Sequence, residues 1–489
     1  MSTKFVLTGV TFPDSTTQTT ASVGQVYPTK LMSTDAQNIV YRKSFAIMND
    51  GSVRGWGVGS NYGLGDGGGN WAQDRSQPTV VGFPPDFPGA VDIQASHTTH
   101  VVCLDKNGQL WTWGQNDYGQ CGNGTNTGVI IPVNVSLNSS GSIYGKTITK
   151  VIVPSGYEGA SDTFVICSDG TMHGCGYNGY GQLGNGNTTD QWNFVRCGTL
   201  TGVTDISAGR ENYCTTMAVA GGQLYSWGRN GDYQFGNGTN TNVSTPTLRN
   251  SGSLSGKTIV KCWALYLTCY ALASDGTLHA AGNQSGGQFG IGNTTNQTAW
   301  VQINTGVANL HGAGWDYPNN VILKTNGTVW VAGSGNYINT SWGPDGYGGY
   351  VESQLGNMTS WTQMTLPAIN GVAVTPTKIL RGGTGSYNNI FVLLSNGWVY
   401  SCGRNQDGQT GTGYVGQSVT NPLNLTNPGI VKTGGALVQD IGVYGHGGET
   451  CLMILTKSGE VRVAGYGANY QNGNMQSYSQ PVPGPIRFN

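Results

Sequence analysis

Hydrophobic and polar positions follow one repeated pattern along most of this chain. In one copy, the apolar segment 101–104 is followed by Asn107-Gly108 and then by residues 109–113, in which polar and apolar residues alternate. Alternation with a period of two residues is typical of a β-strand with one buried face. An Asn-Gly or Asp-Gly pair supplies the positive φ angles of a tight hairpin turn. Each copy of the pattern therefore predicts a β-hairpin.

The pattern recurs eight times, and a glycine closes each alternating stretch. The closing glycines lie 51 to 70 residues apart and are Gly57, Gly114, Gly176, Gly228, Gly282, Gly333, Gly403 and Gly465. A Gly-rich turn and a further strand follow each of them. Four short strands in each repeat are what a propeller blade needs, because radial packing covers the strand edges. No long amphipathic helical pattern is present. The sequence thus predicts an all-β fold, a β-propeller of about eight four-stranded blades over residues 26–489.

The turn after the closing glycine resembles that of a known family. Residues 113–120 read Trp-Gly-Gln-Asn-Asp-Tyr-Gly-Gln, and residues 176–186 read Gly-Tyr-Asn-Gly-Tyr-Gly-Gln-Leu-Gly-Asn-Gly. Both are similar to the repeat of the regulator-of-chromosome-condensation family, and His100 fits the same pattern. The resemblance spans roughly residues 30 to 489 and implies a rigid disc whose loops bind a macromolecule. Members of this family usually have seven blades, so seven blades, with one repeat displaced or merged, are the alternative to eight.

Charged residues are scarce for a globular protein. They make up 10% of the chain against a usual share of about 25%, and 23 basic and 24 acidic side chains give a net charge of −1. A nucleic-acid binder needs clustered Lys and Arg to displace counterions from phosphates, and no such cluster occurs. No apolar stretch is long enough to span a membrane, and the first nine residues lack the apolar core of a signal peptide. We expect neither a nucleic-acid partner nor a membrane span.

The ten cysteines do not form the spacing of a metal site or a disulfide framework. Cys175 and Cys402 take a position that Trp fills in other repeats, several others lie in apolar strand segments, and no Cys-x-x-Cys pair exists. Such residues behave as small buried hydrophobic side chains. We expect free thiols, no bound metal, and synthesis in a reducing cytoplasm.

Residues 1–25 precede the repeats and form a separate segment. Residues 10–21 resemble a short element common in bacteriophage tail-fibre proteins, although Ser15 stands where that element has Gly. The matching residues that would mediate virion attachment are Phe12, Pro13, Asp14 and Gln18. The resemblance implies docking to other virion tail proteins. The alternative is a Thr-rich tail that adds an edge strand to the propeller.

The sixth repeat carries an insertion of about fifteen residues between Gly333 and Gln354. The inserted segment is rich in Gly and aromatic residues. Its candidate receptor-binding residues are Tyr337, Trp342, Asp345, Tyr347 and Tyr350. Aromatic residues on a loop over a rigid scaffold suit a sugar face or a protein surface, because they offer a large area with little entropy to lose. Contact with a neighbouring subunit and packing over a blade edge are the alternatives.

Features that suggest catalysis have structural explanations. Residues 140–147 and 251–258 end in Gly-Lys-Thr but have three residues between the glycines, where a phosphate-binding loop needs four. Their duplication indicates blade connections. His173 and His279 occupy a strand position that aromatic residues hold in other repeats, and His446 beside Glu449 is weak evidence of a site. We expect no catalytic residue, no cofactor and no enzyme activity.

These observations favour a structural and receptor-binding protein of a bacteriophage tail, in a fibre or near the baseplate, made in the cytoplasm of the host bacterium. Residues 1–25 would dock to the virion, and the propeller loops would meet a glycan or protein of the host surface. Several copies, with a homotrimer favoured, would bind by avidity. The alternative is a cellular propeller scaffold that binds a protein partner. A polysaccharide depolymerase, which would need two carboxylates about 5–10 Å apart, is a third possibility.

Overall fold

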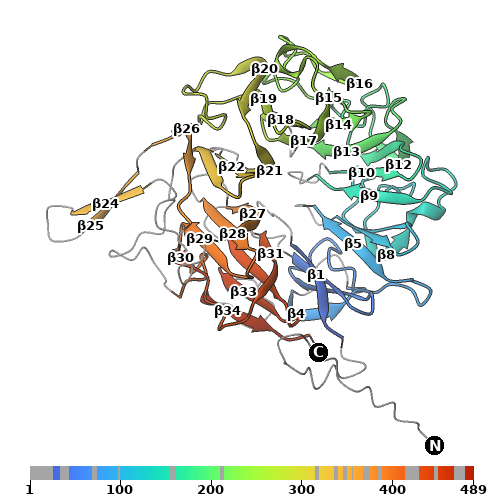
Figure 1. Cartoon of the computed structure of the whole chain (residues 1–489). Helices are drawn as coiled ribbons and strands as arrows, with labels where there is room; N and C mark the ends of the chain where they lie inside the picture. Colours follow the sequence, from blue (N-terminus) through green and yellow to red (C-terminus); the bar gives the residue numbers. More distant parts are fainter. Residues whose placement is uncertain are drawn as a thin grey trace, which may run out of the picture.

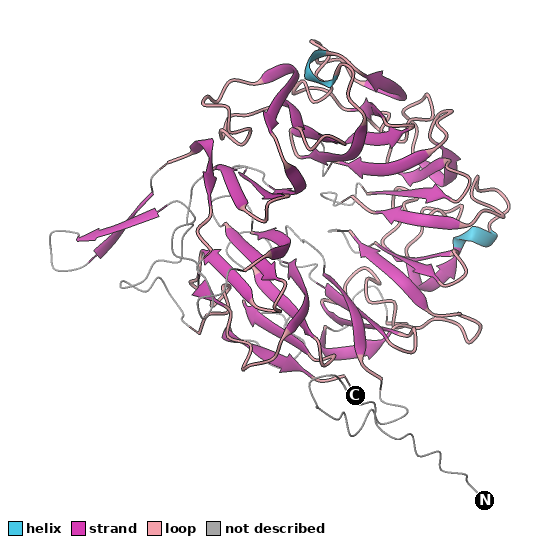
Figure 2. Cartoon of the chain, viewed as in Figure 1, coloured by secondary structure: helices cyan, strands magenta, loops and turns pink. Residues whose placement is uncertain are grey.

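The structure is a computed structural model, and it describes residues 26–33, 43–68, 74–96, 100–154, 161–209, 214–313, 319–334, 340–344, 350–354, 356–366, 374–383, 388–413, 429–444, 450–466 and 479–488. In this part of the chain, eight four-stranded antiparallel sheets follow one another around a central axis (Figure 1). Strands dominate, and the two short 3-10 helices are η2 (Val135–Leu137) and η3 (Gly252–Leu254) (Figure 2). The predicted eight-bladed propeller is confirmed, and the seven-bladed alternative is wrong.

Each blade takes its four strands in chain order. Blades 1 to 4 are β1 (Pro28–Ser33), β2 (Lys43–Met48), β3 (Val53–Gly57) and β4 (Arg75–Val80); β5 (Ala90–Ala95), β6 (Val101–Asp105), β7 (Leu110–Gly114) and β8 (Val129–Asn134); β9 (Ile148–Ile152), β10 (Asp162–Cys167), β11 (Met172–Gly176) and β12 (Gln191–Arg196); and β13 (Val203–Ala208), β14 (Thr215–Ala220), β15 (Gln223–Gly228) and β16 (Val243–Arg249).

Blades 5 to 8 repeat the arrangement, with one addition in blade 6. They are β17 (Ile259–Leu265), β18 (Thr268–Ala273), β19 (Leu278–Gly282) and β20 (Gln297–Asn304); β21 (Val307–Ala313), β22 (Asn319–Lys324), β23 (Val329–Gly333) and β26 (Met358–Gln363); β27 (Pro376–Gly382), β28 (Asn389–Leu394), β29 (Val399–Gly403) and β30 (Gly429–Ile430); and β31 (Val438–Tyr444), β32 (Cys451–Thr456), β33 (Val461–Gly465) and β34 (Gln480–Ile486). Between β23 and β26, strands β24 (Thr340–Pro344) and β25 (Tyr350–Gln354) form a separate two-stranded sheet.

Burial differs between the strands of a blade because the second strand has blades on both of its faces. All residues of β6 and β10 are buried, which explains their nearly continuous apolar sequences. The first strand of each blade lies nearest the axis, and the fourth lies at the rim (Figure 1). Rim strands such as β8 bury only part of their side chains. Third strands such as β7 are buried throughout as well, so alternating burial appears in first strands such as β5 and in the fourth strands.

Every inner strand contains a β-bulge at its second residue. The bulged residues are all exposed, and they are Thr29, Val91, Thr149, Thr204, Val260, Ala308, Thr377 and Gln439. A bulge increases the local twist of a strand and re-aims the side chain that follows it. The residue after each bulge consequently has the same orientation in all eight blades.

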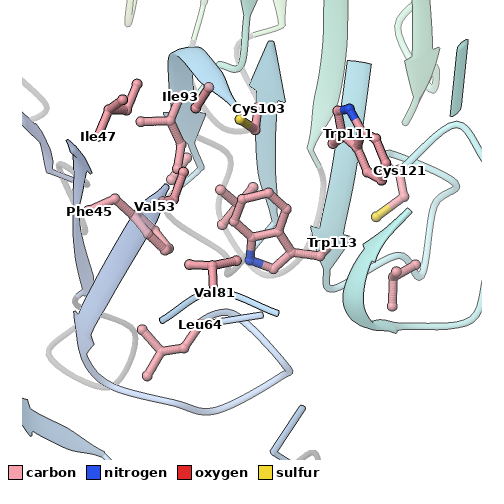
Figure 3. Packing of buried hydrophobic residues seen from close by; sticks show 14 residues of the cluster. Phe45, Ile47, Val53, Leu64, Val81, Ile93, Cys103, Trp111, Trp113 and Cys121 are labelled. Atoms are coloured by element: carbon pink, nitrogen blue, oxygen red, sulfur yellow. The ribbon is translucent and has the colours of Figure 1, made fainter. Parts of the chain in front are cut away.

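The core consists of eight clusters of buried side chains, each shared by two neighbouring blades among the described residues. In the cluster between blades 1 and 2, the Phe45 and Trp113 rings meet edge to face, with 6.0 Å between centroids (Figure 3). Phe45 and Trp113 are both fully buried. Since each interface buries apolar surface from two blades, a blade is stable only beside its neighbours.

Packing of the last blade against the first closes the ring. Here β1 pairs with β2, and the described part of β34 pairs with β33, so blades 1 and 8 share no strand. They share a core cluster that includes Trp56 from blade 1 and Met453 from blade 8. Phe488, beyond the last strand, meets the Trp56 ring edge to face at 5.9 Å. Hydrophobic contact therefore closes the ring.

Backbone hydrogen bonds link neighbouring blades on both faces of the disc. One face carries the tight hairpin turns between the second and third strand of each blade. There, the Ile148 N–H of blade 3 donates to the Gly108 carbonyl of blade 2 (2.8 Å). On the opposite face, where the third strand of each blade connects to the fourth, the Gly124 N–H donates to the Trp192 carbonyl of blade 3 (2.8 Å). We name the first of these the hairpin face, and the face that carries the connections from the third to the fourth strand the turn face.

In the described part of the chain, no helix has the length and apolar character needed to cross a membrane.

Candidate functional site

The insertion predicted to bind a receptor is partly a hairpin. Strands β24 and β25 pair Trp342 with Glu352 and Pro344 with Tyr350, and they project outward from the ring (Figure 1). The expectation of a glycine-rich loop is therefore wrong for these two segments, because backbone pairing satisfies their polar groups. Three of the predicted residues lie outside the described residues: Tyr337, Asp345 and Tyr347.

This hairpin belongs to the turn face, because it lies within the connection from the third to the fourth strand of blade 6. The other connections of this kind carry the Gly-rich turns of the repeat. The turn face is therefore the surface on which the sequence varies over a constant framework. The predicted attachment residues Phe12, Pro13, Asp14 and Gln18, and also His446, lie outside the described residues.

Buried amide side chains hold the turns in shape. Asn116 is fully buried, and its Nδ2 donates to the carbonyl oxygens of Thr125 (2.9 Å) and Thr127 (3.0 Å). Its Oδ1 accepts from the Cys121 N–H (2.8 Å). The equivalent residues in blades 3, 4, 5 and 7 are Asn178, Asn230, Gln284 and Asn405. Because an unsatisfied buried polar group costs free energy, these bonds give each turn one conformation.

In blades 2 and 3, a second buried Gln connects the turn to the next blade through its backbone carbonyl. Gln120 Oε1 accepts from the Tyr118 N–H (3.0 Å), and the Gln120 carbonyl accepts from Thr163 Oγ1 of blade 3 (2.7 Å). Gln182 repeats the arrangement one blade further, where its carbonyl accepts from Trp227 Nε1 (2.7 Å). The turns are therefore rigid parts of the disc.

Tyrosines occupy these turns in the first four blades. Tyr118 and Tyr180 precede the turn glycine in blades 2 and 3. In blades 1 and 4, Tyr62 and Tyr233 take the place of that glycine, with φ of +61° and +64°. The side chains of these four tyrosines are partly exposed. Left-handed backbone costs a non-glycine residue about 1–2 kcal/mol. Sequence reasoning missed these residues, although aligning the eight turns reveals them.

A ring of alternating charge lies on the inner strands. The residue after each bulge is Lys in the odd blades and Asp or Asn in the even blades, in the order Lys30, Asp92, Lys150, Asp205, Lys261, Asn309, Lys378 and Asp440. Three Lys–Asp pairs bridge successive blades: Lys30–Asp92 (2.5 Å), Lys150–Asp205 (2.5 Å) and Lys378–Asp440 (2.7 Å). In the fourth pair Asn309 replaces the carboxylate, and Lys261 has no ion-pair partner among the described residues. The pattern makes two blades the repeating unit.

The histidines in the strands are framework residues, as the sequence predicts. His173 Nδ1 bonds Ser142 Oγ (2.7 Å), and its Nε2 bonds Thr171 Oγ1 (2.8 Å), which donates to Asp169 (2.6 Å). His279, two blades further on, has the same environment. Its Nδ1 bonds Ser253 Oγ (2.8 Å) and its Nε2 bonds Thr277 Oγ1 (2.8 Å). Burial lowers the pKa of both rings to about 4. Both imidazoles are therefore neutral at neutral pH, with both nitrogens engaged.

The remaining buried ionisable groups do not assemble into a reactive cluster. Burial, with a smaller effect of Lys43, lowers the pKa of His100 to about 3, and burial raises the pKa of Asp162. All ten cysteines are buried and free. In the described part of the chain, no group of three or more His, Cys, Asp or Glu could hold a metal ion. The turn face, with its aromatic side chains, is the candidate functional site.

Comparison with known proteins identifies the repeat. A family model described as "Regulator of chromosome condensation (RCC1) repeat" matches residues 107–152 and 221–262, and a second with the same description matches residues 91–120. The chain is 29% identical to the Ultraviolet-B receptor UVR8 of Arabidopsis thaliana over 43% of this chain and 44% of that protein. It is 25% identical to human E3 ubiquitin-protein ligase HERC2 over 51% of this chain and 5% of that protein. This chain therefore carries RCC1 repeats, and it spans less than half of either relative.

Solved structures agree with the fold. Human WBSCR16 has a TM-score of 0.55 at 19% identity, covering 78% of this chain and 89% of that chain. Yeast RCC1 (Prp20), in its complex with Kap60, has a TM-score of 0.53 at 17% identity, covering 88% of this chain and 83% of that chain. At these identities the likeness concerns the fold alone.

Proposed function

We propose that this protein is a non-catalytic recognition protein that binds a macromolecule through its turn face. The observation that carries the proposal is the contrast between framework and surface. Buried amides such as Asn116 and Gln120 hold the turn backbone of blade 2, while partly exposed turn positions carry Tyr in four blades and a hairpin projects from blade 6. A rigid framework with variable exposed loops is typical of binding proteins. Yeast RCC1 (Prp20), which shares the fold, has been solved bound to Kap60.

We further propose that the binding takes place at the tail of a bacteriophage, where residues 1–25 dock to other tail proteins and several copies, favoured as a trimer, meet the host surface. The support is the resemblance of residues 10–21 to tail-fibre proteins, together with low charge and a surface rich in Gly, Asn and Thr. The segments β24 and β25 project outward from the ring, where a receptor or a neighbouring subunit would meet them (Figure 1).

Immuno-gold electron microscopy tests this location. Antibody against the propeller is applied to phage particles from the source culture, and we expect label at the tail tip. Particles that carry no label would overturn the virion proposal. The cellular alternative, a scaffold for one protein partner, would then be tested by size-exclusion chromatography of the native protein, since a stoichiometric complex with a single partner supports it. Release of reducing sugar from a polysaccharide would instead support a depolymerase.

A further inference from the structure

We infer that four aromatic side chains at the junction of blades 2 and 3 form a binding site for a neutral polysaccharide chain. We name them the aromatic patch: Tyr118, Tyr177, Tyr180 and Trp192. The inference rests on the proposed function and names its ligand class. Four observations carry it: the contact geometry, the rigidity of the backbone, the absence of the patch from equivalent turns, and the polar surroundings.

The patch is continuous across the blade junction. The Tyr118 ring of blade 2 meets the Tyr177 ring of blade 3 edge to face, with 5.3 Å between centroids, and Tyr177 meets Tyr180 at 6.4 Å. Trp192 lies against the turn of blade 2, because a Cβ atom on Gly119 would stand 2.6 Å from both its Cα and its Cδ1. Trp192 is 46% exposed. The patch therefore brings partly exposed or exposed aromatic side chains of both blades to one junction.

The backbone beneath the rings is already fixed. Gln120 and Gln182 accept the Tyr118 and Tyr180 N–H groups at 3.0 and 3.1 Å, and the Trp192 carbonyl accepts the Gly124 N–H at 2.8 Å. Preorganised rings lose little entropy when a ligand binds, so a modest contact area yields useful affinity.

The turns do not need these aromatic residues in order to fold. The position of Tyr118 and Tyr180 is held by Asp232, Gly286 and Asp407 in blades 4, 5 and 7, and each backbone N–H there makes the same bond to its Gln. Trp192 stands against the turn glycine Gly119 of blade 2. Against the equivalent turn glycines of blades 3, 5 and 7 stand Ser244, Thr359 and Pro481. Because the fold accepts small, polar and Pro residues at these places, the turn does not require the aromatic residues for its conformation.

The polar surroundings select an uncharged ligand. The segments 115–128 and 177–190, which form the two turns, contain no Lys or Arg, and their acidic residues are Asp117 and Asp190. Asp117 is exposed and accepts from Gln115 Nε2 (2.6 Å). An anionic polymer would meet carboxylates without a compensating cation, so polyanions and nucleic acids are disfavoured. Exposed amides and hydroxyls of Asn, Thr and Gln match the hydroxyl groups of a sugar.

A folded protein fits this surface less well. Protein interfaces have a dry apolar centre, with Lys, Glu and Asp depleted there. On the patch, Gly and polar residues lie between the aromatic residues in the chain, and Asp117 stands next to Tyr118. Pyranose rings stack on aromatic side chains, and their hydroxyls bond to the polar residues beside them.

The test uses the full chain in native gels cast with dextran, with galactomannan or with alginate, together with an array of neutral and anionic glycans. We expect the wild-type protein to bind at least one neutral glycan and to ignore alginate. The variants Tyr118→Ala and Trp192→Ala should each raise the dissociation constant about tenfold or more, because stacking on an aromatic ring is worth about that factor. Tyr144→Ala is the matched control, since Tyr144 is 57% exposed on the connection between β8 and β9 and belongs to no patch.

Each outcome decides the inference. Circular dichroism and thermal unfolding establish that the variants are folded, and Trp192→Phe, which keeps an aromatic ring, should retain most of the binding. No binding to any neutral glycan, binding only to anionic glycans, or equal binding by wild type and patch variants would overturn the proposal. Phage tails that carry label, together with a propeller that binds no neutral glycan, would leave the virion proposal standing and remove the polysaccharide from the patch. A protein complex that the patch variants abolish would assign the patch to a protein.

Discussion

The Lys150 ammonium group and the Asp205 carboxylate lie 2.5 Å apart across the junction of blades 3 and 4. The same carboxylate accepts the Cys262 N–H of blade 5 at 3.0 Å. One side chain thus connects three consecutive blades. An ion pair with a partly exposed partner contributes little by itself, but a carboxylate that also satisfies a backbone donor is harder to replace.

Replacing Asp205 should therefore cost more than replacing its counterpart in blade 2. We expect Asp205→Ala to lower the free energy of unfolding by about 1–2 kcal/mol, because the Cys262 N–H loses its acceptor. Asp92, whose carboxylate bonds Lys30 and its own strand, is the control. We expect Asp92→Ala to cost about 0.5–1 kcal/mol. Urea unfolding measures both, and equal losses would refute the role of Asp205 in joining three blades.

Completing the ring of alternating charge on the inner strands should stabilise the protein slightly. Asn309→Asp places a carboxylate where the other even blades have Asp, next to Lys261. We expect a gain of about 0.2–1 kcal/mol that disappears in 0.5 M salt, since screening weakens exposed ion pairs. The gain should also vanish in the background of Lys261→Met. A gain that persists in that background would mean that the two side chains do not interact.

The histidine networks predict a loss of stability in acid. Burial lowers the folded-state pKa of His173 and His279 to about 4, below the unfolded value of about 6.5. Between these two values the unfolded chain binds more protons, so the contribution of each ring is fully present above pH 6.5 and is lost as the pH falls towards 4. The slope is at most about 1.4 kcal/mol per pH unit for each ring. The double variant His173→Gln/His279→Gln should unfold with a flatter pH dependence than the wild type over this window, and parallel curves would contradict the assignment.

Tyr233 has a conformation that glycine adopts without strain. Its φ is +64°, and the same turn position is glycine in blades 2, 3, 5 and 7. We expect Tyr233→Gly to change the free energy of unfolding by less than about 1 kcal/mol, with relief of strain offsetting the greater freedom of the unfolded chain. Denaturant unfolding provides the measurement. A loss above about 2 kcal/mol would show that the Tyr233 ring contributes to packing.

Removing residues 1–25 should leave the propeller folded. The first described strand, Pro28–Ser33, pairs with β2, and Tyr27 already packs against Gly459 of blade 8. We expect an unchanged thermal midpoint for residues 26–489 and, under the virion proposal, loss of incorporation into particles. Unfolding of the truncated protein would mean that the segment completes a blade.

Much of the candidate site could not be read from single residues. The aromatic insertion of blade 6 was visible as extra sequence, but its pairing of Trp342 with Glu352 depends on a register that composition does not specify. The aromatic patch was hidden because Tyr118 and Trp192 look like ordinary repeat residues. They are 74 residues apart in the chain, and they come to the same junction because Gly119 in a turn of one blade rests on Trp192 in the rim strand of the next.

The structure decided between seven and eight blades. The sequence alone determined the repeat, with its strands and its turns. These follow from short-range rules, since alternation defines a strand and Asn-Gly or Asp-Gly defines a hairpin within about ten residues. Only the tertiary structure decided which neighbouring blades are joined by an ion pair between their inner strands. Lys378 and Asp440 are 62 residues apart, and a bulge in each inner strand aims them at one another. Closure of the ring was also a tertiary outcome, because Trp56 and Met453 share a core only when all eight blades have turned through the full circle.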